Sequence, residues 1–468
     1  MRTLHGTVPH NLAADRYRAI FARRSPAELS AIAHLKRFGE RYAGDNGFRQ
    51  EILGGGAAER VAERHGIDLD PSHAALYDAY STELNACRVL HQQAGRCAET
   101  NPRFDAWRQR QICRCAAELG AIGGVITHPI IAFELSEGCS IGCWFCAVSA
   151  GRFTGSFAYT PDNAALWREI LGVTLDLFGN AAQTGFCYWA TDPSDNPDYP
   201  RFIEDFYFAT GNLPQTTTAA PLRDLGFTRT ILRLYDEYRC FINRFSITSL
   251  KLLNDVHATF TPEELLGVEL VLLNPESLTQ KALAGRARDA QSKKRDPAAA
   301  RGGVAVAPEQ TTIACVSGFV VNMVHRRLQL VSPTSASDRW PLGYRMYGER
   351  HFETAGDLRS AIEDLIASHM PQEITSADVM CLREDVRNER IPSGFELAWN
   401  DGRLAIRGFS GASLLGDMLR EGKHRAGEIQ SELMRAGADV LATACALQGL
   451  FERGLVNDDP EPGTRAGD

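Results

Sequence analysis

The spacing of apolar side chains predicts a helical region at the start of the chain. From residue 25 to about residue 119, apolar positions recur every three or four residues, as they do on one face of a helix. Ser25 and Pro26 are residue types that favour a helix N-cap and first turn. We therefore assign residues 1–124 to an N-terminal helical region.

The pattern changes at about residue 125, where short apolar runs begin to alternate with helical stretches such as 161–179. The runs lie at 129–135, 184–190, 213–219, 243–249 and 267–274. Strands that alternate with helices are typical of a parallel sheet with crossover helices. Two further alternating runs and a helix complete this part, so we expect residues 125–378 to form one α/β unit.

The last part of the chain, residues 379–468, has a different pattern. The stretch GFELAWNDGRLAIRG predicts a β-hairpin, and three short helical patterns follow it, at 413–422, 426–437 and 439–455. A hairpin with three helices is the outline of a winged-helix-like module. Acidic and basic side chains are mixed along it and form no basic face, which argues against DNA as its ligand.

Composition excludes several classes of protein. The chain has 468 residues, 44% of them hydrophobic and 23% charged, which is ordinary for a soluble protein of two or three domains. The formal net charge of -8 gives no electrostatic case for a nucleic-acid or membrane partner. The first residues lack the apolar core of a signal peptide, and no apolar stretch approaches the length of about 18 residues that spans a membrane. We therefore expect a cytoplasmic protein.

Three of the 12 cysteines stand close together, which predicts a metal or redox site. Cys139, Cys143 and Cys146 have C-x3-C-x2-C spacing. Three thiolates from one loop suit zinc or an iron–sulfur cluster. Structural zinc usually takes four ligands, often as two C-x2-C pairs, and the chain has no second pair; Cys113 and Cys115 lie in a helical pattern and are expected to be packing residues. A 4Fe–4S cluster held by three cysteines leaves one iron open to a small molecule.

The same stretch, with Phe145 before the third cysteine and a β-rich run before the loop, resembles the radical SAM superfamily. The resemblance implies an α/β fold, a partial (β/α)6 radical SAM barrel with the helical region before it and the winged-helix-like module after it. It also implies a 4Fe–4S cluster on the three cysteines and S-adenosyl-L-methionine as cofactor. The residues implied to contact that cofactor are Phe145, Thr191, Asp192, Thr217 and Ser246.

Thr191 and Asp192 depart from the superfamily's usual pattern, which has a glycine pair at the corresponding turn. By the resemblance, the two residues would accept the amino group of the cofactor. The alternative is that Asp192 and Asp195 only initiate turns before the prolines that follow them.

A closer resemblance covers roughly residues 125–350. The stretches FELSEGCSIGCWFCAVSAG, WATDPSDNPDY and VNMVHRRLQLVSPTSASDRWPLGYRMYG look like the proteusin-type radical SAM amino-acid epimerases, which mature ribosomally synthesised peptide natural products (RiPPs). That family converts L-residues to D-residues in a precursor peptide by abstracting the Cα hydrogen with a 5′-deoxyadenosyl radical. The resemblance implies two partners, a precursor peptide with leader and core, and an electron donor such as flavodoxin or ferredoxin. The C-terminal module resembles the element that binds such leaders.

Inversion also needs a hydrogen atom returned to the opposite face of Cα, and a cysteine thiol outside the cluster is the expected donor. Cys381, just beyond the α/β unit, is the first candidate, and Cys315, in an alternating apolar run, is the second. Two other functions stay open. One is a different radical SAM enzyme of RiPP maturation that forms thioether or carbon–carbon crosslinks, and the other is a zinc-bearing, non-enzymatic peptide-binding scaffold.

Overall fold

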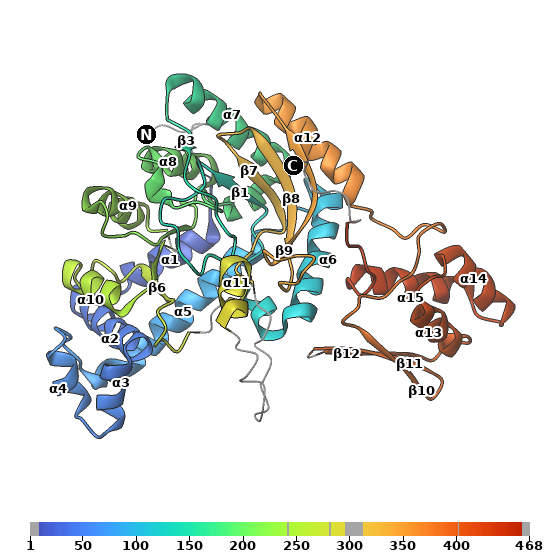
Figure 1. Cartoon of the computed structure of the whole chain (residues 1–468), viewed down its shortest axis with the longest axis horizontal. Helices are drawn as coiled ribbons and strands as arrows, with labels where there is room; N and C mark the ends of the chain where they lie inside the picture. The colour runs from blue at the N-terminus through green and yellow to red at the C-terminus, as the bar shows by residue number, and fades with distance from the viewer. Residues whose placement is uncertain (1–8, 241–242, 280–281, 295–311, 401, 461–468) are drawn as a thin grey trace.

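The computed structural model describes residues 9–240, 243–279, 282–294, 312–400 and 402–460. They form a mixed α/β fold with several small sheets (Figure 1). No helix in these ranges is long and apolar enough to cross a membrane.

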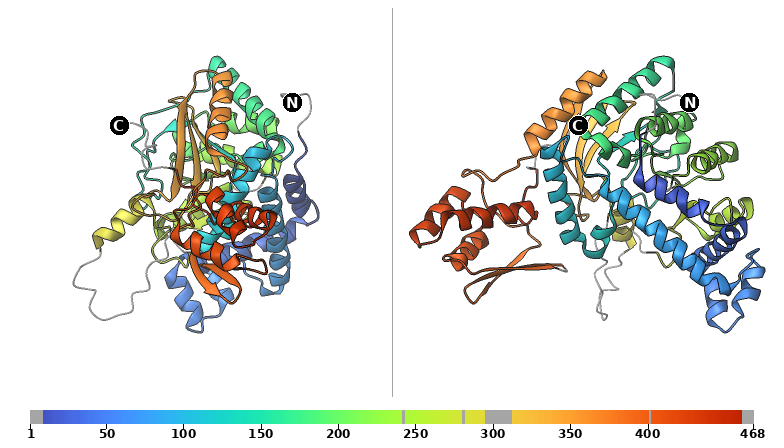
Figure 2. Two further views of the ribbon diagram at one scale, coloured as in Figure 1. Left: turned by 90° about the vertical axis from the view of Figure 1, so that its right-hand side faces the viewer. Right: turned by 180° about the vertical axis from the view of Figure 1, so that it is seen from behind.

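The N-terminal region is helical, as its apolar spacing predicts. Its helices are α1 (Leu12–Ala22), α2 (Pro26–Gly44), α3 (Asn46–Leu53), α4 (Ala58–Glu63), α5 (Ala74–Gln93) and α6 (Pro102–Leu119), with short 3-10 helices η1 (Pro71–His73) and η2 (Gly120–Val125). Ser25 caps α2 in a reciprocal capping box with Glu28. Arg37 of α2 donates hydrogen bonds to the carbonyl oxygens of His257 (3.2 Å) and Phe260 (2.6 Å). These hydrogen bonds join the N-terminal region to the α/β part, which lies next to it in Figure 2.

Parallel strands form the centre of the α/β part. They are β1 (Ile131–Glu134), β4 (Thr216–Thr218), β5 (Asn243–Ile247), β6 (Val268–Leu272) and β7 (Gly318–Asn322). β7 pairs with β1, and β4, β5 and β6 pair in sequence order. Phe186 makes single parallel bridges to Ala132 on one side and Gln215 on the other, which joins the two groups in the order β7, β1, Phe186, β4, β5, β6.

Antiparallel strands extend this series beyond β7. They are β8 (Arg327–Pro333) and β9 (Tyr344–His351), and a separate short pair, β2 (Ser136–Glu137) and β3 (Gly155–Ser156), follows β1. β6 and β9 lie at opposite ends of the series and do not pair, so the described strands form no closed barrel. Of the predicted run 184–190, only Phe186 joins the ladder, because the chain then turns and the Ala190 N–H donates to the Glu134 side chain instead.

Helices cover the strands. They are α7 (Pro161–Phe178), α8 (Tyr199–Thr210), α9 (Leu225–Tyr238), α10 (Leu250–Thr259), α11 (Gly285–Lys294) and α12 (Ala355–His369), with η3 (Gly179–Thr184) and η4 (Pro193–Asp195). Phe133 of β1 packs edge-on against Trp167 of α7, with 4.9 Å between the ring centroids, and Trp167 packs in the same way against Phe202 of α8. These buried aromatic rings fix β1, and with it the start of the cysteine loop, against the helix layer.

The C-terminal part has a hydrophobic core of its own, made by residues between Met380 and Val456. The predicted hairpin is present as β11 (Gly394–Trp399) and β12 (Gly402–Arg407), and the three predicted helices are α13 (Ala412–Glu421), α14 (Ala426–Arg435) and α15 (Val440–Glu452). A third strand, β10 (Arg387–Ile391), pairs with β11 and was not predicted, because its alternation is interrupted by charged residues. In Figure 1 this part lies to one side of the α/β part.

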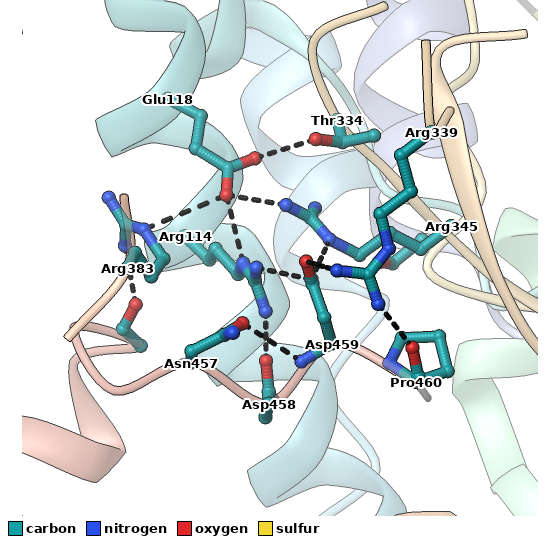
Figure 3. Close-up of polar contacts among 12 residues, drawn as sticks. Arg114, Glu118, Thr334, Arg339, Arg345, Arg383, Asn457, Asp458, Asp459 and Pro460 are labelled. Carbon is teal, nitrogen blue, oxygen red and sulfur yellow. Dashed lines mark hydrogen bonds and ion pairs between the residues drawn. The ribbon is translucent and has the colours of Figure 1, made fainter. Parts of the chain in front are cut away.

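A buried ion-pair network joins the C-terminal segment to the rest of the molecule (Figure 3). Glu118 of α6 pairs with Arg114 (2.9 Å) on the same helix and Arg345 (2.6 Å) on β9, and Arg383 lies 3.6 Å away. Asp459 pairs with Arg345 (2.6 Å) and Arg114 (2.5 Å). Burial alone would raise the pKa of Glu118, but the charges of Arg345 and Arg114 outweigh it and lower that pKa to about 2.

The network makes stability depend on pH in the acid range. Because the folded-state pKa of Glu118 lies below the ordinary 4.5, its contribution is present above that value and is lost as the pH falls toward about 2. The free energy of unfolding, measured by urea titration, should therefore fall by up to about 1.4 kcal/mol per pH unit from this group alone. Glu118→Gln should lower stability at pH 7 by about 3–5 kcal/mol and flatten this dependence.

The matched control is Glu384→Gln, which changes an exposed carboxylate. Its stability should stay within about 0.5 kcal/mol of the wild type. An unchanged pH profile in Glu118→Gln would show that the network does not carry the acid sensitivity.

Candidate functional site

The three clustered cysteines lie on a loop that begins where β1 and β2 end. Two glycines in this loop have positive φ, Gly138 at 70° and Gly142 at 63°. A Cβ atom on Gly138 would lie 2.2 Å from the carbonyl oxygen of Arg152, so a side chain is excluded there. The N–H of Cys139 donates to the carbonyl oxygen of Gly151 at 2.9 Å. This hydrogen bond joins residues near the two ends of the loop.

All three thiols are partly exposed, and main-chain N–H groups point toward two of them. Ala150 donates to the Sγ of Cys146 at 3.4 Å, and the main-chain N–H groups of Ile141 and Gly142 act to lower the pKa of Cys139. Burial raises the pKa of Cys139 to about 11 and raises that of Cys143 as well. N–H donors aimed at sulfur stabilise negative charge on it, which is the form in which cysteine binds metal.

Arg286 and Gly285 of α11 brace this loop from outside. The Arg286 guanidinium donates to the carbonyl oxygens of Cys143 (3.0 Å) and Ala150, and its main-chain N–H donates to that of Cys146 at 3.0 Å. Gly285 has φ 51°, and a Cβ atom there would lie 2.3 Å from the carbonyl oxygen of Ala147. Sequence analysis missed both residues. Their signal is a Gly-Arg pair that opens a short helix within a polar segment.

The three cysteines of the loop are a donor set that suits zinc or an iron–sulfur cluster. Among the described residues, these cysteines included, no three His, Cys, Asp or Glu side chains are grouped closely enough to hold a metal ion as they stand. The loop offers three partly exposed thiols, with main-chain N–H groups that act on the sulfurs of Cys139 and Cys146. Beside it, Ser136 Oγ and Thr191 Oγ1 are buried without a hydrogen-bond partner among the described residues, so polar groups are free for a ligand.

Asp192 is fully occupied by hydrogen bonds from the protein. Its carboxylate accepts from the N–H of Ala219 (2.8 Å), the hydroxyl of Thr218 (2.9 Å) and both the N–H and hydroxyl of Ser194. These donors use about all of the acceptor positions of one carboxylate. This arrangement corresponds to the turn-forming role that sequence analysis left open as the alternative.

Asp195 ties the cysteine loop to this turn. Its carboxylate accepts from the N–H and the hydroxyl of Ser140, and it pairs with Arg223 at 3.0 Å. The link holds the turn that contains Thr191 and Asp192 beside the cysteine loop. Phe145 lies on the loop itself, with its ring 5.3 Å from that of Trp144.

Thr217 and Ser246 lie on one face of the parallel strands, which we call the polar face; it carries Tyr188, Gln215, Thr217, Arg244, Ser246 and Glu269. Side chains alternate along a strand, and the neighbours of these residues on β5, such as Phe245 and Ile247, are buried against α10 instead. The Tyr188 hydroxyl is 2.7 Å from Thr217 Oγ1.

The charged side chains of the polar face are paired with each other. Glu269 pairs with Arg244 and with Arg88 of α5, each at 3.1 Å. Arg88 therefore links the N-terminal helical region to the polar face. No local sequence pattern predicts this contact.

The two candidate hydrogen-donor cysteines are placed differently. Cys315 packs against the same cluster as Tyr188, and Arg244 acts on its thiol, although burial dominates and raises the pKa of Cys315 to about 12. The thiol of Cys381 donates to the carbonyl oxygen of Leu382 at 3.4 Å, and its carbonyl oxygen accepts from Asn457 at 2.8 Å. The contacts found for Cys381 are within the C-terminal part, whereas Cys315 lies beside the polar face.

Glu134, at the end of β1, is a buried carboxyl that sequence analysis missed. It accepts from the Ala190 N–H and from the side-chain amide of Asn322, each at 2.9 Å, and Asn322 also donates to Glu137. Burial raises the pKa of Glu134. Its signal in the sequence is a single acid at the end of the apolar run PIIAFEL.

Comparison with known proteins places this α/β protein, with its cysteine loop at the end of a parallel strand, in a family. The chain is 42% identical over 476 residues to the uncharacterized protein y4wI of Sinorhizobium fredii (strain NBRC 101917 / NGR234), an alignment that covers 96% of this chain and 92% of that protein. The chain belongs to the same family as that protein. No family model and no solved structure matches it.

Proposed function

We propose that this protein is a radical SAM peptide epimerase, which converts L- to D-amino acid residues in a ribosomally synthesised precursor peptide. The observation that carries the proposal is the Cys139, Cys143 and Cys146 loop at the end of the parallel strand β1. The resemblance of the surrounding stretches to proteusin-type epimerases supplies the substrate class.

The order of the parallel segments supports a partial (β/α)6 barrel. The series β1, Phe186, β4, β5, β6 follows chain order, with helices between its members and an open side at β6. In barrels of parallel strands, the loops at the carboxyl ends hold the active site. We also propose a division into residues 1–124, 125–378 and 379–468, which the separate hydrophobic core of the last part supports.

The three cysteines would hold a 4Fe–4S cluster, and the polar groups around them would hold S-adenosyl-L-methionine. When bound, this pair supplies the 5′-deoxyadenosyl radical that removes a hydrogen atom from Cα. Thr191, Thr217 and Ser246 would orient the cofactor, and Asp192 would position the turn that carries Thr191. The exposed Trp144 side of the loop leaves room for an electron donor such as flavodoxin or ferredoxin.

A cysteine thiol would complete the inversion by giving its hydrogen atom to the opposite face of the Cα radical. This breaks the S–H bond, forms the new Cα–H bond and leaves a sulfur radical. One electron from the electron donor and one proton from solvent then restore the thiol. The position of Cys315 beside the polar face favours it over Cys381, the first candidate from the sequence.

The C-terminal part would bind the leader of the precursor. A groove of about 340 Å³ lies between β12 and α15, lined by Leu404, Ile406, Phe409, Cys445 and Ala446 among others. β12 is an edge strand of its sheet, so an extended peptide can pair with it while side chains enter the groove. The two alternatives, a crosslinking radical SAM enzyme and a zinc-bearing peptide-binding scaffold, are separated from this proposal by the metal content and product analyses below.

The first test concerns the cluster. Anaerobically purified protein should contain about four iron and four sulfide per chain. Alanine at Cys139, Cys143 or Cys146 should remove both and abolish formation of 5′-deoxyadenosine from S-adenosyl-L-methionine. Cys113→Ala, which changes an exposed cysteine on α6, is the control and should keep the cluster. Zinc without iron in the wild type would favour the scaffold instead.

The second test separates the two thiols. Cys315→Ala should still form 5′-deoxyadenosine with the precursor peptide but yield no D-residue and no deuterium at Cα in deuterated water. Cys381→Ala should epimerise at a rate within about threefold of the wild type. The reverse result would return the role to Cys381. New crosslinks in place of D-residues in the product mass spectrum would contradict the epimerase proposal itself.

The third test concerns the groove of the C-terminal part. Cys445→Trp should fill it and weaken leader binding in calorimetry at least about tenfold, or about 1.4 kcal/mol. Uncoupled cleavage of S-adenosyl-L-methionine should stay unchanged. Val440→Trp, at an exposed position of the same helix outside the groove, is the matched control. Equal leader affinity in both variants would place leader recognition elsewhere.

A further inference from the structure

Two neighbouring cavities lie between the N-terminal helices and the sheet. The larger, about 410 Å³, lies between α2, α5 and β6, and the smaller, about 290 Å³, lies between α1, α2 and α9. Asn243, Tyr17 and Gly267 line both of them. The volume of the larger cavity falls within the range of about 300–1,000 Å³ that is usual for ligand pockets.

Asn243, the first residue of β5, is the unusual group in their wall. Its side chain is buried, with 1% exposure, and neither its Nδ2 nor its Oδ1 has a hydrogen-bond partner among the described residues. Buried polar groups almost always have partners, so an unmatched carboxamide calls for a ligand or water in the cavity. A carboxamide offers donors and an acceptor side by side, which is complementary to another amide.

The charged side chains around the larger cavity are already satisfied. Lys36 pairs with Glu40 and donates to the carbonyl oxygen of Leu265 at 3.0 Å, and Glu269 pairs with Arg88 at 3.1 Å. Glu40 also pairs with His257 at 3.2 Å. Since each charge faces an opposite charge, the cavity favours an uncharged occupant.

The larger cavity follows the free edge of β6. The N–H of Leu273 donates to the carbonyl oxygen of Ile247 on β5, and alternate residues of a parallel strand bond to opposite sides, so the main chain of Leu270 faces the cavity. Glu269, the preceding residue, also lines the cavity. Asn243 lies on the face of β5 that carries Phe245 and Ile247, opposite the polar face. The cavity therefore lies at the edge of the sheet, on the side that the helices cover.

We propose that this cavity binds an uncharged stretch of the precursor peptide. The peptide pairs one of its amides with the carboxamide of Asn243 and another with the main chain of Leu270. The identity of the peptide as the precursor rests on the proposed function, whereas the amide-binding cavity rests on the geometry alone. The N-terminal helical region then holds part of the substrate in addition to covering the sheet.

The test uses the full chain and the blocked, uncharged tetrapeptide acetyl-(Ala)4-amide, with binding followed by saturation-transfer NMR. Gly39 of α2 lines the larger cavity, and a Cβ atom there meets nothing within 4 Å, so Gly39→Leu places its side chain in the cavity from a backbone position that accepts one. Asn243→Leu removes the carboxamide and keeps a similar volume, which leaves folding nearly unaffected if the amide has no protein partner. Both variants should weaken peptide binding at least tenfold.

The matched control is Gly172→Leu, which changes a glycine of α7 that also has open space around it and lies outside both cavities. It should bind the peptide as the wild type does. A wild type that binds no peptide, equal binding by Gly39→Leu, or equal binding of acetyl-(Glu)4-amide each overturns the proposal, the first leaving only water in the cavity.

Iron content separates this proposal from the proposed function. Wild-type protein that binds the tetrapeptide but carries no iron–sulfur cluster supports the cavity and overturns the enzyme. Protein that carries the cluster and forms 5′-deoxyadenosine, yet binds no tetrapeptide, overturns the cavity alone.

Discussion

The buried carboxylate of Glu118 is the constraint on which the arrangement of the three parts depends. Removing a carboxylate from water is costly unless cations surround it, and here Arg114 of α6 and Arg345 of β9 do so, with Asp459 balancing them (Figure 3). Glu118 and Arg114 come from the N-terminal region, Arg345 from the α/β part and Asp459 from the C-terminal segment. The charges are compensated only when helix, sheet and C-terminal segment are together, so the network defines how those parts meet.

Local signals in the sequence predicted most of the helices and strands, but they did not predict which strands pair with each other. The Ser25 cap and the apolar runs predicted α2, β1 and β5 because these elements depend on neighbours in the chain. β10 was missed because its charged residues follow no alternation, and its stability comes from pairing with β11. Phe186 makes only single bridges for a similar reason. The N–H of Ala190 donates to the side chain of Glu134, a tertiary contact, and the chain leaves the sheet there.

The residues of the candidate site also fall into those that the local sequence identifies and those that only tertiary contacts bring together. The spacing of Cys139, Cys143 and Cys146 identified the loop, whereas Thr217 and Ser246 were named only through the resemblance. Their position on one face follows from the strand register in the structure. The Gly285-Arg286 pair marks only the start of a short helix in the sequence. The contact of Arg286 with main-chain oxygens about 140 positions away could not be predicted, because main-chain oxygens have no sequence signature. The relation of Cys315 and Cys381 to the polar face likewise depends on tertiary packing.

The position of β1 has a consequence for synthesis of the chain. β1 pairs with β7, and side chains at the ends of the two strands, Glu134 and Asn322, are 188 residues apart in sequence. A ribosome delivers the N-terminal strand first, so the cysteine loop emerges well before the strand that closes its flank. During that interval its thiols stand beside an open sheet edge. The loop therefore reaches its final surroundings only after β7 has left the ribosome.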